Sequence, residues 1–141
     1  MLRTLMLTAS ERLHPVEHSV FTSRSAPEWS DLARERATHP RRAIFIAHNA
    51  GTTCFNGVLW AFDSHDEHSI EFTWTWADGG NAPDVMAALV AQARQWGVRL
   101  GRGHLRLAAD NTHEADLFLR LGFVEVGVAR DGVRRVLASR P

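Results

Sequence analysis

Two short segments of the sequence carry side chains that could do acid-base chemistry or bind a substrate. In the run SIEFTWTW, residues 69–76, Glu71 could act as a general base that takes a proton from an amine. Trp74 and Trp76 follow on the same run and could line an apolar substrate pocket. Simpler interpretations exist, with Glu71 as a solvent-facing acid and the two tryptophans as core. Both interpretations stay open.

The second segment is LRLAADNTHEADLFLRLGF, residues 105–123, which holds Asn111 and His113 at the start of a predicted helix. An imidazole titrates near neutral pH, so His113 could serve as an acid or a base, although an exposed histidine is the simpler interpretation. Asn111 is first a helix cap and only second a candidate contact for a cofactor.

Other reactive groups give little support for chemistry. The turn DSHDEH, residues 63–68, has the side-chain types of a metal site, but it lacks the ligand geometry of a regular element, so we predict no metal. Cys54 is the only cysteine, which excludes an internal disulfide and fits a reducing, cytoplasmic location. The chain has no Tyr, which removes one class of general acid.

Composition narrows the class of protein further. The chain has 141 residues, 45% of them hydrophobic, which suits a single domain over residues 1–141. Sixteen basic and sixteen acidic residues cancel, so we expect no nucleic-acid partner. No apolar run is long enough to span a membrane.

Hydrophobic periodicity places the elements that must position these side chains. Asn81 and Asp84 are predicted to cap the helix after residue 76 and Gly97 to end it; Asn111 caps the next helix and Gly122 ends it. Asn56-Gly57 indicates either a hairpin turn or a bulge, and Asp131-Gly132 a hairpin. The predicted strands are 2–8, 42–48, 52–62, 69–76, 104–109 and a final hairpin, and the predicted helices are 25–40, 82–96 and 112–121.

This order predicts an α+β fold with a mixed central sheet flanked by helices. It resembles the GNAT superfamily of N-acetyltransferases, whose last motif has an Asn, an aromatic residue seven positions on, and then Gly-Phe. Asn111, Phe118 and Gly122-Phe123 fall on that spacing. The resemblance covers roughly residues 15 to 130, with a shortened first helix, and it implies that the strands ending near Trp76 and Asp110 run parallel and separate.

The resemblance also implies an acetyl-CoA site in the turn WADGGNAPDVMAALV, residues 76–90, but this turn departs from the family pattern. Asn81 stands at the basic position, and Asp84 and Met86 stand at two small positions. Asp84 would repel a diphosphate and Met86 would occupy space that the backbone needs. We therefore expect acetyl-CoA to bind weakly or not at all. Phe118 stands where many relatives have a Tyr that protonates the thiolate; we expect it to border one pocket with Trp74 and Trp76.

Three functions follow. The first is a divergent GNAT acyltransferase that acts on an amine of a small molecule or a peptide. The second is a GNAT-fold enzyme that has given up acyl-CoA for other acid-base chemistry in a biosynthetic pathway. The third is a non-catalytic binding module. The sequence leaves a homodimer open as the assembly.

Overall fold

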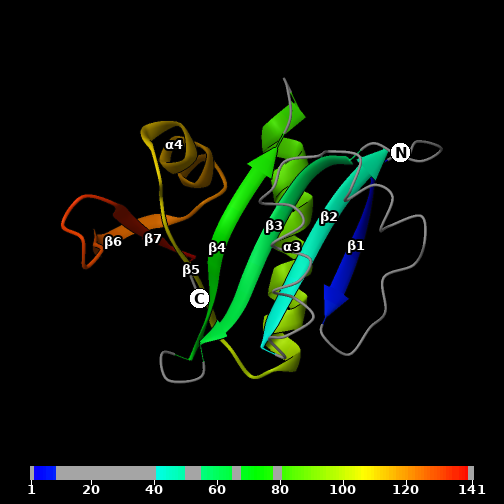
Figure 1. Ribbon diagram of the computed structural model, residues 1–141, viewed down its shortest axis with the longest axis horizontal. Helices are drawn as coiled ribbons and strands as arrows, with labels where there is room; N and C mark the ends of the chain where they lie inside the picture. Colours follow the sequence, from blue (N-terminus) through cyan, green and yellow to red (C-terminus); the bar gives the residue numbers. More distant parts are fainter. Residues whose placement is uncertain (1, 9–40, 50–54, 65–67, 78–80, 140–141) are drawn as a thin grey trace.

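The computed structural model describes residues 2–8, 41–49, 55–64, 68–77 and 81–139 (Figure 1). The predicted first helix, Cys54 and residues 65–67 lie outside this part of the chain. No helix in the described part has the length and apolar character that a membrane span requires.

One mixed sheet of seven strands organises the described residues, in the order β1-β2-β3-β4-β5-β7-β6. Neighbouring strands are antiparallel except β4 and β5, which run parallel because helix α3 connects them as a crossover. The α+β prediction is therefore confirmed. The elements are β1 Leu2–Thr8, β2 Arg42–Asn49, β3 Phe55–Ser64, β4 Ser69–Ala77, α3 Ala82–Arg99, β5 His104–Ala108, α4 Thr112–Arg120, β6 Val124–Val128 and β7 Arg135–Ala138.

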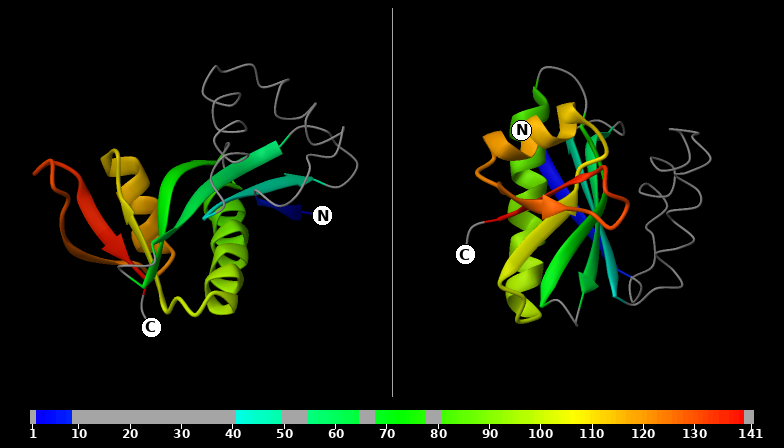
Figure 2. Two further views of the ribbon diagram at one scale, coloured as in Figure 1. Left: turned by 60° about the horizontal axis from the view of Figure 1, so that its bottom comes forward. Right: turned by 90° about the vertical axis from the view of Figure 1, so that its left-hand side faces the viewer.

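Helix α3 lies along one face of the sheet, and α4 packs beside the hairpin β6–β7 (Figure 2). The apolar stripe of α3 is buried on the sheet because its residues recur at helical spacing: Val85, Met86, Leu89, Val90, Ala93 and Trp96. Gly57 on β3 permits this close packing, since a Cβ there would lie 2.6 Å from Cγ1 of Val85.

The described helices α3 and α4 each end in a Schellman motif built on a glycine with positive φ. In α4, Gly122 has φ 94°, and the N–H of Phe123 donates to the carbonyl of Phe118. This confirms Gly122 as the predicted stop. In α3 the prediction was wrong: the helix continues through Gly97 to Arg99, and Gly101 takes the positive φ of 76°. Gly97 instead permits close packing, because a Cβ there would lie 3.0 Å from Cγ1 of Ile70.

Two irregularities in the sheet redirect side chains. Between β2 and β3 the register shifts beside Gly57, so Asn56-Gly57 forms a bulge rather than a hairpin turn. Between β3 and β4, Trp60 pairs with Trp74 and Ala61 pairs with Phe72, which leaves Thr73 as an extra residue. Strict alternation along SIEFTWTW predicts a common face for Phe72, Trp74 and Trp76, and the bulge makes that prediction wrong.

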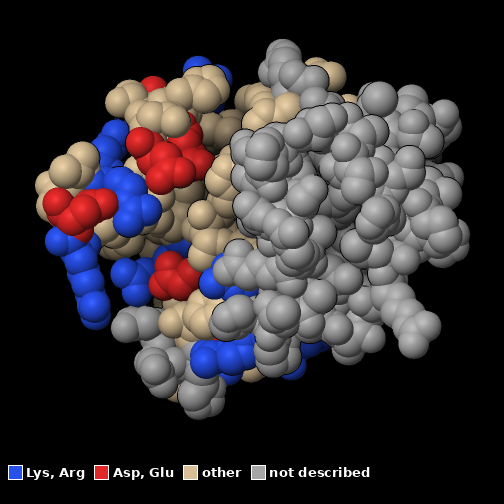
Figure 3. Space-filling model, in the orientation of Figure 1, with Lys and Arg blue, Asp and Glu red and all other residues tan. Residues whose placement is uncertain are grey.

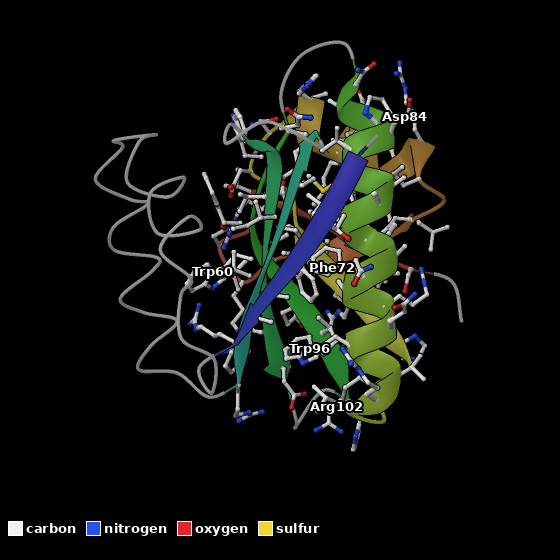
Figure 4. The ribbon with its side chains drawn as sticks, turned by 90° about the vertical axis from the view of Figure 1, so that its right-hand side faces the viewer. Trp60, Phe72, Asp84, Trp96 and Arg102 are labelled. Atoms are coloured by element: carbon white, nitrogen blue, oxygen red, sulfur yellow. The ribbon has the colours of Figure 1, made fainter. Side chains whose placement is uncertain are left out.

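The Thr73 bulge puts these aromatic side chains on opposite faces of the sheet. Phe72 faces α3 and belongs to the core. Trp74 shares a face with its partner Trp60, which lies on the side of the sheet away from α3 (Figure 4). Trp76 pairs with Val58 on that same far side, two residues further along β4.

The parallel strands separate at their carboxyl ends. The last paired residues are Phe72 and Leu107, and β4 then continues to Ala77 without a partner on β5. This confirms that the two strands run parallel and diverge. The divergence leaves the backbone of β4 without a strand neighbour on its β5 side, beside the beginnings of α3 and α4.

The final hairpin forms where Asp131-Gly132 predicts it. The Asp131 carboxylate accepts hydrogen bonds from the N–H groups of Val133 and Arg134, at 2.9 and 3.0 Å, and Gly132 has φ 74°. These two N–H groups, followed by the guanidinium of Arg134, lower the pKa of Asp131 from 3.8 to about 2. Acidic and basic side chains intermingle over this side of the molecule (Figure 3).

Candidate functional site

Two adjoining cavities lie where β4 ends and α3 and α4 begin, at the upper end of the molecule in Figure 1. We call them together the groove. The larger has a volume of about 390 Å³ and is lined by Ala77, Ala82, Pro83, His113, Asp116, Leu117 and Arg120. The smaller has a volume of about 200 Å³ and is lined by Thr75, Trp76, Ala77, Ala82, Met86, Asn111, His113, Glu114 and Leu117. The separation of β4 from β5 therefore coincides with a groove between strand and helices.

Glu114 ties the inner wall of the groove together. One carboxylate oxygen, Oε1, accepts a hydrogen bond from the N–H of Asp110 at 2.9 Å. The other, Oε2, accepts a hydrogen bond from the hydroxyl of Thr75 on β4. Asn111 caps α4 as predicted, because its Oδ1 accepts the N–H of Glu114 at 2.8 Å. This network joins β4 directly to the beginning of α4.

The first turn of α3 differs from its predicted form. Asn81 stands at the N-cap position, but its side chain makes no capping hydrogen bond, because its backbone has φ −95° and ψ 10° rather than the extended conformation of a capping residue. The prediction that Asn81 satisfies the first N–H groups of α3 is therefore wrong.

The other residues of this turn make it a poor site for an anion. Pro83 lines the larger cavity and has no N–H to offer. Asp84 is exposed at the same end of α3 (Figure 4), and Met86 is fully buried beside the smaller cavity. The turn thus keeps the negative charge and the bulk that the sequence predicts there.

Helix α4 brings two charged residues to the groove that sequence reasoning missed. Asp116 and Arg120 both line the larger cavity, opposite Pro83. A signal was present, because His113, Leu117 and Arg120 recur at i, i+4 and i+7 and so share one face of the helix. Arg120 is therefore a cation close to α3 although it lies far from it in the sequence.

The structure brings together three of the predicted site residues. Trp76, Asn111 and His113 all line the smaller cavity, and His113 also borders the larger one. Their roles in binding or catalysis stay predictions.

Glu71 and Trp74 lie elsewhere. Glu71 lies on the face of the sheet away from α3, where its carboxylate is 3.8 Å from Arg106 and accepts a hydrogen bond from Ser69 at 3.3 Å. Trp74 lies on the same face. Neither lines the groove, so the expectation of a single pocket with Trp74 and Trp76 side by side in it is not met.

Phe118 does not line the groove either, which corrects its expected place. Its side chain is fully buried, with its ring centroid 5.1 Å from Phe123 and 6.0 Å from Phe72. The reason is helical geometry, because Ala115 and Phe118 form the core-facing side of α4 while His113 and Leu117 face the groove.

Within the described ranges no three His, Cys, Asp or Glu residues are grouped as a metal site requires. His65, Asp66 and Glu67 lie outside those ranges. Apolar side chains line the groove, together with hydroxyl, amide, carboxylate, imidazole and guanidinium groups.

Comparison with known proteins bears on the fold. No protein-family model matches the chain, and no curated protein matches it. Among solved structures it is similar to the PaiA N-acetyltransferase of Thermoplasma acidophilum in complex with coenzyme A, with a TM-score of 0.70 and 9% identity over 100% of this chain and 99% of that one. It is also similar to the aminoglycoside 6'-N-acetyltransferase of Enterococcus faecium, with a TM-score of 0.67 and 16% identity over 97% and 99% of the two chains.

A third similar structure is a nourseothricin acetyltransferase, with a TM-score of 0.57 and 21% identity. The match covers 70% of this chain but only 64% of that protein's length. At such identities the likeness establishes the fold alone. The described strand order and the parallel pair that separates at its end agree with it, so the fold is that of the GNAT acetyltransferases.

Proposed function

We propose that this protein is a GNAT-fold acyltransferase that moves an acyl group from a thioester to an amine of a small molecule or a peptide. The observation that carries the proposal is the groove at the open end of the β4–β5 pair. The similar structures described above are acetyltransferases by name, and one contains coenzyme A. Function still depends on the site rather than the fold, so the residues must support it.

The donor side of the reaction belongs to the groove. Acyl-CoA, when bound, would supply the thioester at the end of its pantetheine arm, which is thin enough for a narrow space between a strand and a helix. Trp76 and Asn111 would contact that arm. His113 would donate a proton to the sulfur as the C–S bond breaks, which is the task of the Tyr that this chain lacks.

The acceptor side belongs to the opposite face of the sheet. Glu71 lies there next to Phe72, the last β4 residue that pairs with β5. Its carboxylate would take a proton from the amine before the nitrogen attacks the carbonyl carbon and the C–N bond forms. Arg106 lies 3.8 Å from this carboxylate, on the neighbouring strand β5.

The groove suits the arm of coenzyme A better than its diphosphate. The first turn of α3 offers Pro83 without an N–H and Asp84 with a charge of the wrong sign. Arg120 is the compensating cation, but Asp116 on the same wall offsets it. We therefore propose that acetyl-CoA binds in the millimolar range, roughly −4 kcal/mol.

The same turn favours a second candidate function. If the diphosphate is not held at all, the protein would be a GNAT-fold enzyme without acyl-CoA, or a binding module that uses the groove for another ligand. The observation in favour is Met86, which is fully buried where an acyl-CoA turn needs a small residue.

An acyl-transfer assay separates the two functions. Free thiol is measured with millimolar acetyl-CoA and a panel of primary amines that includes aminoglycosides and lysine peptides, and products are identified by mass spectrometry. We expect an acetylated amine with at least one acceptor class, and a fall in kcat of at least about 10²-fold for Glu71→Gln. Thr73→Val, an exposed β4 change outside the groove, is the control. No acetylated product in any reaction would favour the second candidate.

A further inference from the structure

The hydrogen bond between Thr75 and Glu114 crosses the groove between its two walls. Thr75 belongs to β4, three residues beyond the last pair with β5. Glu114 belongs to α4 and is fixed on the β5 side, because its Oε1 holds the N–H of Asp110 and its own N–H is held by Asn111. The bond therefore joins β4 to the continuation of β5 at the point where the two strands have separated.

A ligand that reaches the open end of the strand pair must pass this contact. The smaller cavity has Thr75 and Glu114 in its wall, with Ala77 further out along β4 and Ala82 at the beginning of α3. The last strand pair, Phe72 and Leu107, lies on the inner side. The hydrogen bond thus stands between the cavity and the place where the two strands part.

We propose that Thr75 and Glu114 form a gate in the donor groove, which must open before an extended arm such as pantetheine can lie between β4 and β5. The inference rests on the proposed function, because it assigns the groove to the acyl donor. In the free protein the closed gate stabilises the docking of α4 on the sheet. On binding, the same contact is lost, so it lowers the affinity for the donor.

Energetic linkage makes the gate measurable. A contact that exists in the free protein and is broken in the complex stabilises the fold and opposes binding by the same free energy. A hydrogen bond to a carboxylate is strong enough for its loss to change an affinity about tenfold. Removing the Thr75 hydroxyl should therefore weaken the fold and tighten binding, which is the opposite of what the loss of a ligand contact does.

Three variants test the gate against a purely structural tie. Thr75→Val keeps the shape of the side chain and removes the donor, Thr75→Ser keeps the donor, and Thr73→Val removes a neighbouring β4 hydroxyl that bonds the Trp60 carbonyl outside the groove. Binding of pantetheine and of coenzyme A is measured by calorimetry, and the free energy of unfolding by urea titration. We expect about tenfold tighter binding and lower stability for Thr75→Val alone.

The outcomes are distinct. Unchanged or weaker binding by Thr75→Val overturns the gate, and so does an absence of binding by that variant up to the solubility limit of both ligands. If Thr75→Ser also binds more tightly, the hydroxyl is not the cause and the gate is again overturned. Tighter binding by Thr75→Val in a protein that acetylates no amine would leave the gate standing while the transferase proposal fails. Acyl transfer without tighter binding by Thr75→Val would support the transferase proposal and overturn the gate.

Discussion

Arg102 and Asp63 form a nearly buried ion pair at the end of the molecule opposite Asp84 (Figure 4). The guanidinium Nε donates to Oδ1 at 2.6 Å and Nη2 to Oδ2 at 3.4 Å, and the side chains are only 13% and 11% exposed. Arg102 follows the Schellman turn that ends α3, while Asp63 lies near the end of β3. The pair therefore joins the exit of the crossover helix to the sheet.

We expect either Asp63→Asn or Arg102→Gln to lower the free energy of unfolding by about 2 kcal/mol, because each removes one charge of a nearly buried ion pair. Urea titration measures the loss. The double variant should lose less than the sum of the two single losses, since both charges are then removed. The exposed pair Arg134–Asp131 serves as the comparison, and Arg134→Gln should leave the stability almost unchanged. Additive losses in the double variant would show that the pair contributes no coupling.

Residues whose role depends on neighbours in sequence could be predicted, and those whose role depends on packing could not. Asn111 and Gly122 act within one helical turn, so their types and spacing were enough. Phe118 and Arg120 depend on how α4 rotates against the core and against α3. Asn81 shows a further limit, because a residue whose type suits a helix cap forms the capping hydrogen bond only when its own backbone is extended.

At the scale of elements, the first turn of α3 decides how well the groove holds phosphate. The triple variant Asn81→Arg, Asp84→Gly and Met86→Gly adds a cation, removes a carboxylate and frees the backbone. We expect acetyl-CoA binding to tighten at least about tenfold, because charge-assisted hydrogen bonds to phosphate replace repulsion. Calorimetry measures the gain.

Each glycine should cost the helix up to about 1 kcal/mol, and Met86→Gly should cost at least about 2 kcal/mol more because it leaves a cavity in the core. Urea titration would report both losses. Asp84→Asn alone is the matched control, since it removes only the charge at an exposed position. It should give a smaller gain with no loss of stability. An affinity that stays the same in the triple variant would show that the donor does not reach this turn.

The stability of the turn in the β6–β7 hairpin should depend on pH through Asp131. The lowered pKa of Asp131 means that its hydrogen bonds stabilise the turn above the ordinary aspartate pKa of 3.8 and lose this effect as pH falls through about 2. NMR titration of the carboxyl carbons should give an Asp131 pKa near 2. Because backbone N–H groups are the largest cause, Arg134→Gln should leave the pKa still below 3.8. A pKa at the ordinary value in the unmodified protein would mean that the turn is not formed.

Most strands and helices were predictable because each is a continuous periodic segment. The bulge at Thr73 was not, since an alternating run such as SIEFTWTW carries no local mark for an extra residue. That single residue moves Trp74 and Trp76 to the face opposite Phe72 and so divides the expected aromatic pocket.

At the scale of the molecule, the order of elements predicted the mixed sheet and the parallel pair, because a strand-helix-strand unit permits little else. The insertion of β7 between β5 and β6 could not be derived in this way. A hairpin can add to a sheet by either of its strands, and the choice is made by packing rather than by local sequence. The candidate site was predictable only in part for the same reason, since it forms where three separate elements meet. Trp76, Asn111 and His113 were predicted, whereas Asp116 and Arg120 were missed.

Titration with acetyl-CoA, followed by backbone amide NMR shifts, tests the central claim that the groove is a weakly phosphate-binding donor site. We predict shifts at Thr75 to Ala77, Ala82, His113 and Leu117, with a midpoint in the millimolar range, roughly −4 kcal/mol. Saturation at micromolar concentrations would contradict the weak hold on phosphate. Shifts confined to other parts of the molecule, or none at all, would contradict the assignment of the groove.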